Sequence, residues 1–312
     1  MQTPRAVAAL DCGTNSTRLL IVDSSGTVLA REMRITRLGQ GVDATQRLAP
    51  DAIARTVSVL AGYRQMMDAT GVERSRLVAT SAARDAENGD EFLSQASEAV
   101  GTRAELLSGT EEGELSYVGA TSGLEPSEGD DVVLDIGGGS TELIVSRDGR
   151  IGAYSTQLGC VRLSERYLRH DPPTTDEVAD LVVGVAAELD LAFAAVPALA
   201  SLRPGSRLIG LAGTVSTLTM LNQALGTYNR DRVHHSVMTL ADVQRWCEVL
   251  AAEPAAARRL RPGMVEGRQD VIVGGALILR ETMQRLGLGE CLVSESDILD
   301  GLVASMTVVE AN

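Results

Sequence analysis

The pattern of apolar and polar positions is nearly the same in two stretches of the chain, residues 10–39 and 134–159. Each stretch opens with an apolar run that ends in Asp, passes through a small polar turn into a second apolar run, and reaches a third, alternating segment after another turn. Alternation with a period of two is typical of strands, and the pairs at 25–26 (Ser-Gly) and 148–149 (Asp-Gly) are of the kind that close hairpins. Each stretch therefore predicts a three-stranded meander.

The two stretches also match residue by residue when Asp11 is aligned with Asp135. The further identical positions then include Gly13/Gly137, Ser16/Ser140, Thr17/Thr141 and Leu19/Leu143. Both stretches end in a T-x-L-G sequence, at 36–39 and 156–159. Chance explains one such match but not the ordered series, so we infer that the meander is duplicated.

Behind each meander the apolar spacing changes to the helical period, with short apolar runs between the helices. Helices are expected over 51–70, 87–100, from about residue 110, over 175–195 and over 272–286, and buried strands over 77–80, 104–107 and 208–212. Each half is a meander followed by α/β units, which predicts an α/β fold. A polar Gly/Pro segment at 122–129 is expected to be a hinge, giving lobes 1–125 and 126–312.

Composition excludes several classes of protein. The chain has 312 residues, which suits two domains, and a formal net charge of −14 without a basic block, which argues against nucleic-acid binding. Its four cysteines form no C-x-x-C, and the adjacent His234 and His235 are expected in a loop or at the surface rather than on a metal. The apolar run directly after Arg5 carries Asp11, so we expect no cleaved signal peptide, no membrane span and a cytoplasmic location.

The two polar turns are candidate phosphate sites. Successive backbone N–H groups in a tight turn form an anion-binding concavity, and glycines allow a phosphate to approach bare backbone. One glycine-rich turn is a weak signal because hairpins need glycine anyway, but two equivalent turns are stronger. The residues expected to bind phosphate are Gly13, Thr14, Asn15, Ser16 and Arg18 in the first turn and Gly137, Gly138, Gly139 and Ser140 in the second.

Each turn also carries a carboxylate, which is costly beside a phosphate unless a cation lies between them. We therefore expect Asp11, Asp135 and Glu142 to be ligands of Mg²⁺, directly or through water. The alternative for the two aspartates is an Asx-turn cap at a strand end, and for Glu142 an ordinary solvated strand position.

A third cluster of polar residues, 108–114, reads as a helix start. Ser108 and Glu111 fit a capping box, which would engage Glu111 with the backbone and leave Glu112 to accept a proton from a lytic water. Acidic residues are common in first helical turns for dipole reasons, which is the alternative for Glu112. Arg84 follows a predicted buried strand and is a candidate clamp on a phosphoryl group, or else a surface arginine.

These segments, in this order, resemble the Ppx/GppA family of exopolyphosphatases and guanosine pentaphosphate phosphohydrolases. The segments that carry the resemblance are 11–17, 81–88, 109–113 and 135–142, with 210–217 similar to the family's adenosine-type motif. The resemblance implies the actin-like (ribonuclease H-like) two-lobe fold with an active-site cleft between the lobes. It also implies that Glu112 is the general base, and that Arg84 and the two turns bind phosphate.

The chain departs from the family pattern in two places. Longer family members carry further C-terminal helical domains, so for this chain we expect a preference for short polyphosphate. Near the end, the family's usual S-E-x-G-L-R-E-G reads SESDILDG at 294–301, with Asp297 and Leu299 at the Gly and Arg positions. The resemblance therefore does not support a ligand contact from that loop.

The resulting interpretation is a Mg²⁺-dependent exopolyphosphatase, with Mn²⁺ as a possible substitute, in which Glu112 activates water for in-line attack on a terminal phosphate. Guanosine pentaphosphate is the alternative substrate, although only 3% of residues are aromatic and could stack on a purine. A regulatory protein that senses phosphate or an alarmone without turnover is the alternative of another class. The sequence is compatible with a homodimer and does not decide the oligomeric state.

Overall fold

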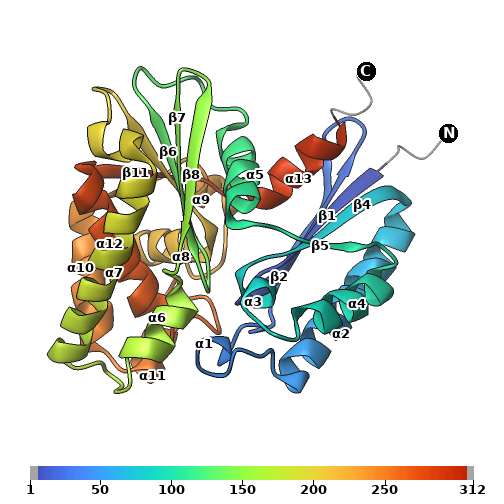
Figure 1. Ribbon diagram of the computed structural model, residues 1–312, viewed down its shortest axis with the longest axis horizontal. Helices are drawn as coiled ribbons and strands as arrows, with labels where there is room; N and C mark the ends of the chain where they lie inside the picture. The colour runs from blue at the N-terminus through green and yellow to red at the C-terminus, as the bar shows by residue number, and fades with distance from the viewer. Residues whose placement is uncertain (1–5, 308–312) are drawn as a thin grey trace. The chain divides into compact units, whose positions relative to one another are not determined.

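A computed structural model describes residues 6–307 of the chain and divides them into two compact units (Figure 1). Unit 1 comprises residues 6–119 and 297–307, and unit 2 comprises residues 120–296. The division differs from the predicted lobes because the last helix returns to unit 1, where its apolar side packs on the first sheet. The expected absence of a signal peptide concerns the N-terminus, of which residues 1–5 lie outside the described range. Over residues 6–307, no helix combines the length and apolarity needed to cross a membrane.

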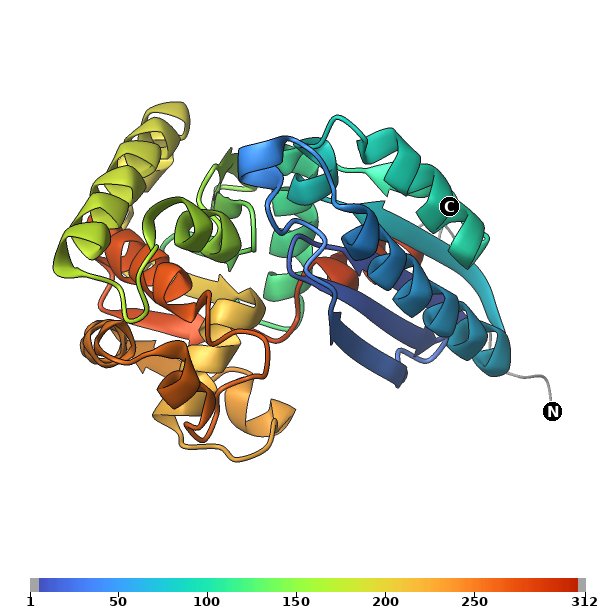
Figure 2. The ribbon, with the colours of Figure 1, turned by 90° about the horizontal axis from the view of Figure 1, so that it is seen from below.

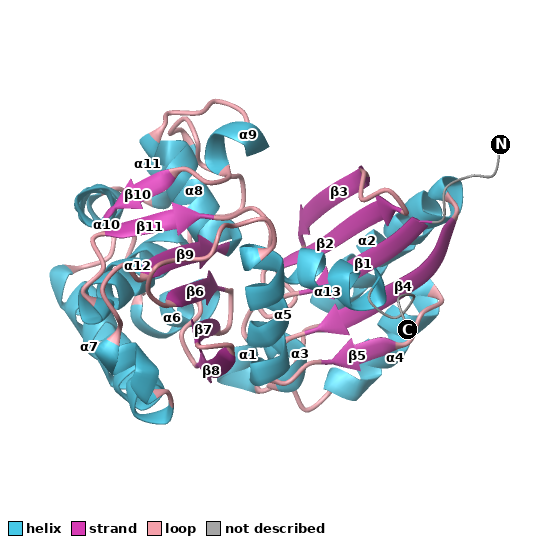
Figure 3. Ribbon diagram, turned by 90° about the horizontal axis from the view of Figure 1, so that it is seen from above, coloured by secondary structure: helices cyan, strands magenta, loops and turns pink. Residues whose placement is uncertain are grey.

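Unit 1 contains a mixed five-stranded sheet in the order β3-β2-β1-β4-β5 (Figure 3). Its first three strands form an antiparallel meander, and β4 and β5 extend it in parallel on the other side of β1. The strands are β1 Ala6–Cys12, β2 Ser16–Asp23, β3 Val28–Ile35, β4 Val72–Ala79 and β5 Ala104–Leu106. The predicted meander is therefore confirmed, and the predicted strand at 77–80 is the end of a longer β4.

Helices cover both faces of this sheet. The helices of unit 1 are α1 Val42–Thr45, α2 Pro50–Thr70, α3 Ser81–Arg84, α4 Gly89–Val100, α5 Gly109–Thr121 and α13 Ile298–Thr307. Helices α2 and α4 lie on one face of the sheet (Figure 2). Even-numbered residues of β1 share a core with these two helices, whereas Val7 and Ala9 share a second core with α13 and Leu115 of α5. Because side chains alternate along a strand, Asp11 lies on the face of β1 that α5 and α13 cover.

Unit 2 contains a six-stranded sheet in the order β10-β11-β9-β6-β7-β8. The strands are β6 Asp131–Ile136, β7 Thr141–Arg147, β8 Arg150–Thr156, β9 Arg207–Leu211, β10 Val237–Thr239 and β11 Glu290–Val293. The helices are α6 Cys160–Tyr167, α7 Thr175–Ala195, the 3₁₀ helix η1 Pro197–Ser201, α8 Ala212–Asn222, α9 Arg230–Val233, α10 Leu240–Ala252, α11 Ala255–Arg259 and α12 Ile272–Leu286. One core joins the sheet to α7, α8, α10 and α12.

The two sheets have the same topology. In both, an antiparallel meander is followed by two parallel strands on the far side of its first strand, so β3-β2-β1-β4-β5 corresponds to β8-β7-β6-β9-β11. Strand β10 is an addition at the edge of the second sheet. The predicted α/β fold with a duplicated, actin-like architecture is confirmed.

Helix boundaries agree well with the sequence pattern. The helices predicted over 175–195 and 272–286 are α7 and α12, residue for residue. Helices α2 and α4 end directly before Gly71 and Gly101, whose φ angles are 68° and 74°. The predicted strand at 208–212 ends one residue earlier, because Ala212 adopts a φ of 64° and begins α8. The helices that were not predicted are α1, α3, α6, α8, α9, α10, α11, α13 and the 3₁₀ helix η1.

Candidate active site

The carboxylate of Asp11 stands at the end of β1, opposite Arg18 of β2 in the antiparallel register. Arg18 donates from Nε and Nη2 to Asp11 Oδ2, at 3.0 and 2.6 Å. Burial raises the pKa of Asp11 above its usual value, although the adjacent guanidinium opposes that shift. The other oxygen, Asp11 Oδ1, is buried and has no hydrogen-bond partner. Such an orphaned oxygen is the kind of atom that a cation or an ordered water would satisfy.

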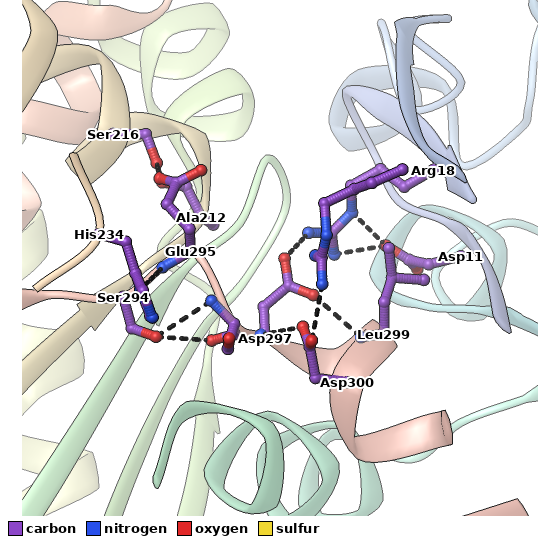
Figure 4. Close-up of polar contacts among 12 residues, drawn as sticks. Asp11, Arg18, Ala212, Ser216, His234, Ser294, Glu295, Asp297, Leu299 and Asp300 are labelled. Atoms are coloured by element: carbon purple, nitrogen blue, oxygen red, sulfur yellow. Dashed lines mark hydrogen bonds and ion pairs between the residues drawn. The ribbon is translucent and has the colours of Figure 1, made fainter. Parts of the chain in front are cut away.

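Arg18 also binds a carboxylate from the far end of the chain. Its Nη1 pairs with Oδ2 of Asp297, the residue that precedes α13 (Figure 4). Asp297 Oδ1 in turn accepts a hydrogen bond from the backbone N–H of Leu299 at 2.9 Å, and Asp300 Oδ2 accepts one from Asp297 N at 2.9 Å. Arg31 of β3 pairs with Asp300. The loop whose ligand role was in doubt therefore takes part in the polar network around Asp11.

The first predicted phosphate turn is closed by a hydrogen bond from Gly13 N to Ser16 O, at 3.0 Å. Gly13 N–H is thus used within the turn. Thr14 and Asn15 at its tip are 7% and 6% exposed, and Asn15 Nδ2 is a buried donor without a partner. A buried amide donor of this kind suits an anion.

The second turn repeats the first, with Gly137 N donating to Ser140 O at 3.0 Å. Three glycines keep it free of side chains until Ser140, which is buried. The buried Arg162 of α6 donates from Nε to Gly139 O at 2.6 Å and so supports the turn from behind. Arg162 was not predicted, and its position three residues after the T-x-L-G sequence is the only sequence signal for it.

The glycine of each T-x-L-G sequence touches the corresponding turn. A Cβ at Gly39 would overlap the Thr14 side chain, and a Cβ at Gly159 would overlap the backbone of Gly138. Gly39 N donates to Thr14 O at 2.8 Å, and Val161 N donates to Gly138 O at 2.9 Å. The repeated glycine is therefore explained by close packing against the phosphate turn.

In unit 2 the residue aligned with Arg18 is Glu142. Asp135 of β6 and Glu142 of β7 are direct partners in the antiparallel register, and they are 8% and 1% exposed. Burial rules out the alternative that Glu142 is a solvated strand position. Side chains at paired positions lie on the same face, within about 5.5 Å at Cβ. Ser155 is the partner of Glu142 on β8 and donates to Glu142 Oε1 at 2.7 Å, so Asp135, Glu142 and Ser155 lie side by side on three adjacent strands.

The two repeats thus place opposite charges at the same structural position. In unit 1 an arginine compensates the aspartate, whereas in unit 2 a second carboxylate stands beside it. Two neighbouring carboxylates are oxygen ligands of the kind that a divalent cation binds. Within residues 6–307 no three His, Cys, Asp or Glu side chains are grouped as a metal site. A cation here would depend on a carboxylate pair completed by water and phosphate, which is the usual way that Mg²⁺ binds.

Glu112 lies in the first turn of α5. The capping box is confirmed, since Ser108 Oγ and Glu111 Oε2 are 2.7 Å apart and the reciprocal backbone bonds are 2.9 and 3.2 Å. Glu111 is exposed, whereas Glu112 is 9% exposed and pairs with Arg84 Nη1 at 3.2 Å. Arg84 Nη1 also donates to Leu107 O at 2.8 Å. The structure therefore brings two predicted site residues, Arg84 and Glu112, into direct contact.

The segment 210–217 spans the end of β9 and the start of α8. Gly213 has no room for a side chain, because a Cβ would overlap the guanidinium of Arg268, which is 8% exposed. Ser216 donates to the carboxylate of Glu295, and Glu295 N donates to His234 Nδ1 at 3.0 Å (Figure 4). Tyr228 also donates to the Glu295 carboxylate. His234 and His235 stack with ring centroids 3.7 Å apart. They lie between α9 and β10, so their expected position in a loop is confirmed.

Comparison with known proteins decides the family. The model of the Ppx/GppA phosphatase family matches residues 20–309. The chain belongs to the Ppx/GppA phosphatase family. Exopolyphosphatase 2 of Mycobacterium tuberculosis is 43% identical to it, over 96% of this chain and 98% of that protein.

Solved structures of Ppx/GppA proteins share the fold. The crystal structure of an exopolyphosphatase-like protein has a TM-score of 0.92 at 34% identity and covers 98% of this chain and 99% of its own. The Ppx/GppA family member of Aquifex aeolicus has a TM-score of 0.81 at 31% identity and covers 99% of both chains. The resemblance inferred from the sequence motifs is therefore confirmed.

Proposed function

We propose that the chain is an exopolyphosphatase, which hydrolyses the terminal phosphoanhydride bond of inorganic polyphosphate. The observation that carries the proposal is the buried carboxylate pair, Asp135 and Glu142, beside a turn of three glycines. A carboxylate pair next to bare backbone donors suits a complex of a divalent cation with phosphate. Membership of the Ppx/GppA family and the 43% identity to an exopolyphosphatase add support.

The donor set fits Mg²⁺, and Mn²⁺ as a substitute. In this proposal Asp135 and Glu142 would hold the ion in unit 2. In unit 1, Asp11 would offer a cation its unpartnered Oδ1. Once bound, the ion would supply charge stabilisation at the phosphate oxygens.

Phosphate contacts are assigned to the two turns. Gly13 to Ser16 and Gly137 to Ser140 would surround phosphate oxygens with backbone and side-chain donors, among them the unpartnered Asn15 Nδ2. Arg18 already donates to Asp11 and Asp297, so its part is to hold Asp11 and to add local positive charge. Arg84 would stabilise the charge that develops on the transferred phosphoryl group.

Glu112 is proposed as the general base. Its pairing with Arg84 keeps the carboxylate in one place, and its neighbour Glu111 is occupied with the helix cap. Glu112 would orient a water molecule and accept its proton as the water attacks in line. Positioning and electrostatics then account for catalysis, because phosphoryl transfer to water needs no covalent intermediate.

The test is phosphate release by purified protein from short and long polyphosphate, guanosine pentaphosphate and ATP, with and without chelator. We expect release from polyphosphate that a chelator abolishes. Release from guanosine pentaphosphate alone would transfer the proposal to that substrate, and binding without release would favour a sensor. The expected preference for short chains is read from the same assay, and the cytoplasmic location stays a prediction.

Glu112→Gln is expected to lower kcat by roughly 10²–10⁴-fold while polyphosphate binding persists. Glu111→Gln is the matched control, because glutamine also serves in a capping box and Glu111 faces solvent. Near-normal turnover of the Glu112 variant would remove it from the role of base.

A further inference from the structure

Arg18 binds Asp11 in an unusual way, through one carboxylate oxygen only. Both Nε and Nη2 donate to Oδ2, at 3.0 and 2.6 Å. An arginine that meets a carboxylate favours the bidentate arrangement, in which two parallel N–H bonds reach both oxygens. Here Oδ1 has no partner, although Asp11 is only 3% exposed. Some other contact must therefore hold the guanidinium in this orientation.

That contact is Asp297. Its Oδ2 takes Arg18 Nη1, the remaining edge of the guanidinium (Figure 4). Asp297 is itself fixed, because its Oδ1 accepts the N–H of Leu299 and its own N–H donates to Asp300, both at 2.9 Å. The carboxylate that orients Arg18 is thus held by the backbone at the start of α13.

The helix that follows Asp297 is also fixed within unit 1. Gly119 of α5 lies against the carbonyl of Asp297, and Gly301 of α13 lies against the carbonyl of Leu115, with no space for a Cβ at either glycine. Helix α13 can approach α5 this closely only because both contacts are made by glycine. Asp297 therefore has a defined position relative to the sheet that carries Asp11 and Arg18.

We propose that Asp297 is a positioning residue of the active site, which keeps Asp11 Oδ1 open to a divalent cation. By holding Nη1, it confines Arg18 to Oδ2 and prevents a bidentate pair that would occupy both oxygens of Asp11. It also keeps the local charge negative, since two carboxylates surround one guanidinium. Without the Asp297 charge, the Asp11–Arg18 pair is neutral and attracts a cation less. The inference rests on the proposed role of Asp11 as a cation ligand.

The competing explanation is that Asp297 only caps α13. An asparagine at this position would cap equally well through its side-chain oxygen, but it removes the charge that holds Arg18. Asp297→Asn therefore separates the two roles. Asp300→Asn is the matched control, because Asp300 lies in the first turn of the same helix, pairs with Arg31 instead of Arg18, and keeps an acceptor for Asp297 N after substitution.

The experiment is titration of the purified protein with Mn²⁺, with the free ion followed by electron paramagnetic resonance and unfolding midpoints recorded in parallel. We expect roughly tenfold weaker Mn²⁺ binding for Asp297→Asn, as for other residues that orient a ligand, with an unfolding midpoint near that of the wild type. Asp300→Asn should bind Mn²⁺ like the wild type. Asp11→Asn measures the binding that remains without the Asp11 carboxylate.

Wild-type Mn²⁺ binding by Asp297→Asn overturns the proposal, as does wild-type binding by Asp11→Asn. If Asp297→Asn fails to fold, Arg18→Lys replaces it, because lysine cannot hold two carboxylates with a fork and should weaken Mn²⁺ binding likewise. The proposed function is tested separately. If Asp297→Asn binds Mn²⁺ more weakly but the wild type releases no phosphate, the positioning role is supported and the exopolyphosphatase is refuted. If Asp297→Asn binds Mn²⁺ normally and the wild type releases phosphate, the positioning role is refuted and the exopolyphosphatase is supported.

Discussion

Replacing Gly119 with alanine is expected to destabilise unit 1, although alanine normally favours a helix. Gly119 lies near the end of α5, and an added Cβ would overlap the Asp297 carbonyl group and lie 2.9 Å from Gly301 N. Real Cβ atoms keep at least 3.0 Å from such neighbours. The atoms in the way are backbone, which cannot rotate aside, so α5 and α13 must separate.

The magnitude follows from two opposing effects. Alanine gains up to about 1 kcal/mol of helix propensity over glycine. Forcing an extra carbon into a close-packed contact costs typically about 1–3 kcal/mol, and more where the neighbours are rigid. Because every blocking atom at Gly119 is backbone, we place the cost at the upper end and expect a net loss of about 2 kcal/mol.

Urea unfolding of Gly119→Ala and wild type measures this loss, and Gly62→Ala in α2 is the matched control. Gly62 is exposed within its helix, and nothing lies within 4 Å of a Cβ there, so alanine should stabilise by up to about 1 kcal/mol. Gly119→Ala should also weaken Mn²⁺ binding, because the carbonyl it displaces belongs to Asp297. A Gly119 variant as stable as the Gly62 variant would refute the close helix crossing.

Two further predictions concern unit 2. Hydrogen bonds from Arg147 lower the pKa of the buried Asp130 to about 2; burial opposes this shift, and Arg203 adds to it. The ionised Asp130 therefore contributes its full stabilisation of the folded protein above about pH 4, and this contribution is lost as the pH falls toward 2. Asp130→Asn should lower the urea midpoint at pH 7 but progressively less below pH 4, and a difference independent of pH would contradict this origin. Ala212→Gly should raise stability by about 0.5–1 kcal/mol, because φ of 64° strains alanine, and a lower melting temperature would show that the strain is absent.

What could be predicted from the sequence was local or repeated. The capping box of Ser108 and Glu111 depends on a spacing of three residues, and the ends of α2 and α4 depend on single glycines with positive φ. The duplicated meander could be detected because two copies of one pattern occur in one chain. In each case the physical cause lies within a few residues of the signal.

What could not be predicted depends on contacts between distant segments. Arg18 and Asp297 are 279 positions apart, and nothing near Arg18 in the sequence indicates that its Nη1 will bind a second carboxylate. The sequence left Glu142 as either a Mg²⁺ ligand or a solvated strand residue, because its burial depends on the neighbouring elements. The T-x-L-G glycines were noticed as a repeat, but their contact with the phosphate turns became visible only in three dimensions.

The return of α13 to unit 1 has a consequence for biosynthesis. Val7, Leu20 and Val78 form one apolar face of the first sheet, and Leu299 and Leu302 of α13 cover it. Because a ribosome produces the chain from its N-terminus, that face stays uncovered until all of unit 2 has been synthesised. The first sheet to emerge is therefore the last to be completed, and a nascent chain arrested before residue 297 should present an apolar surface to chaperones.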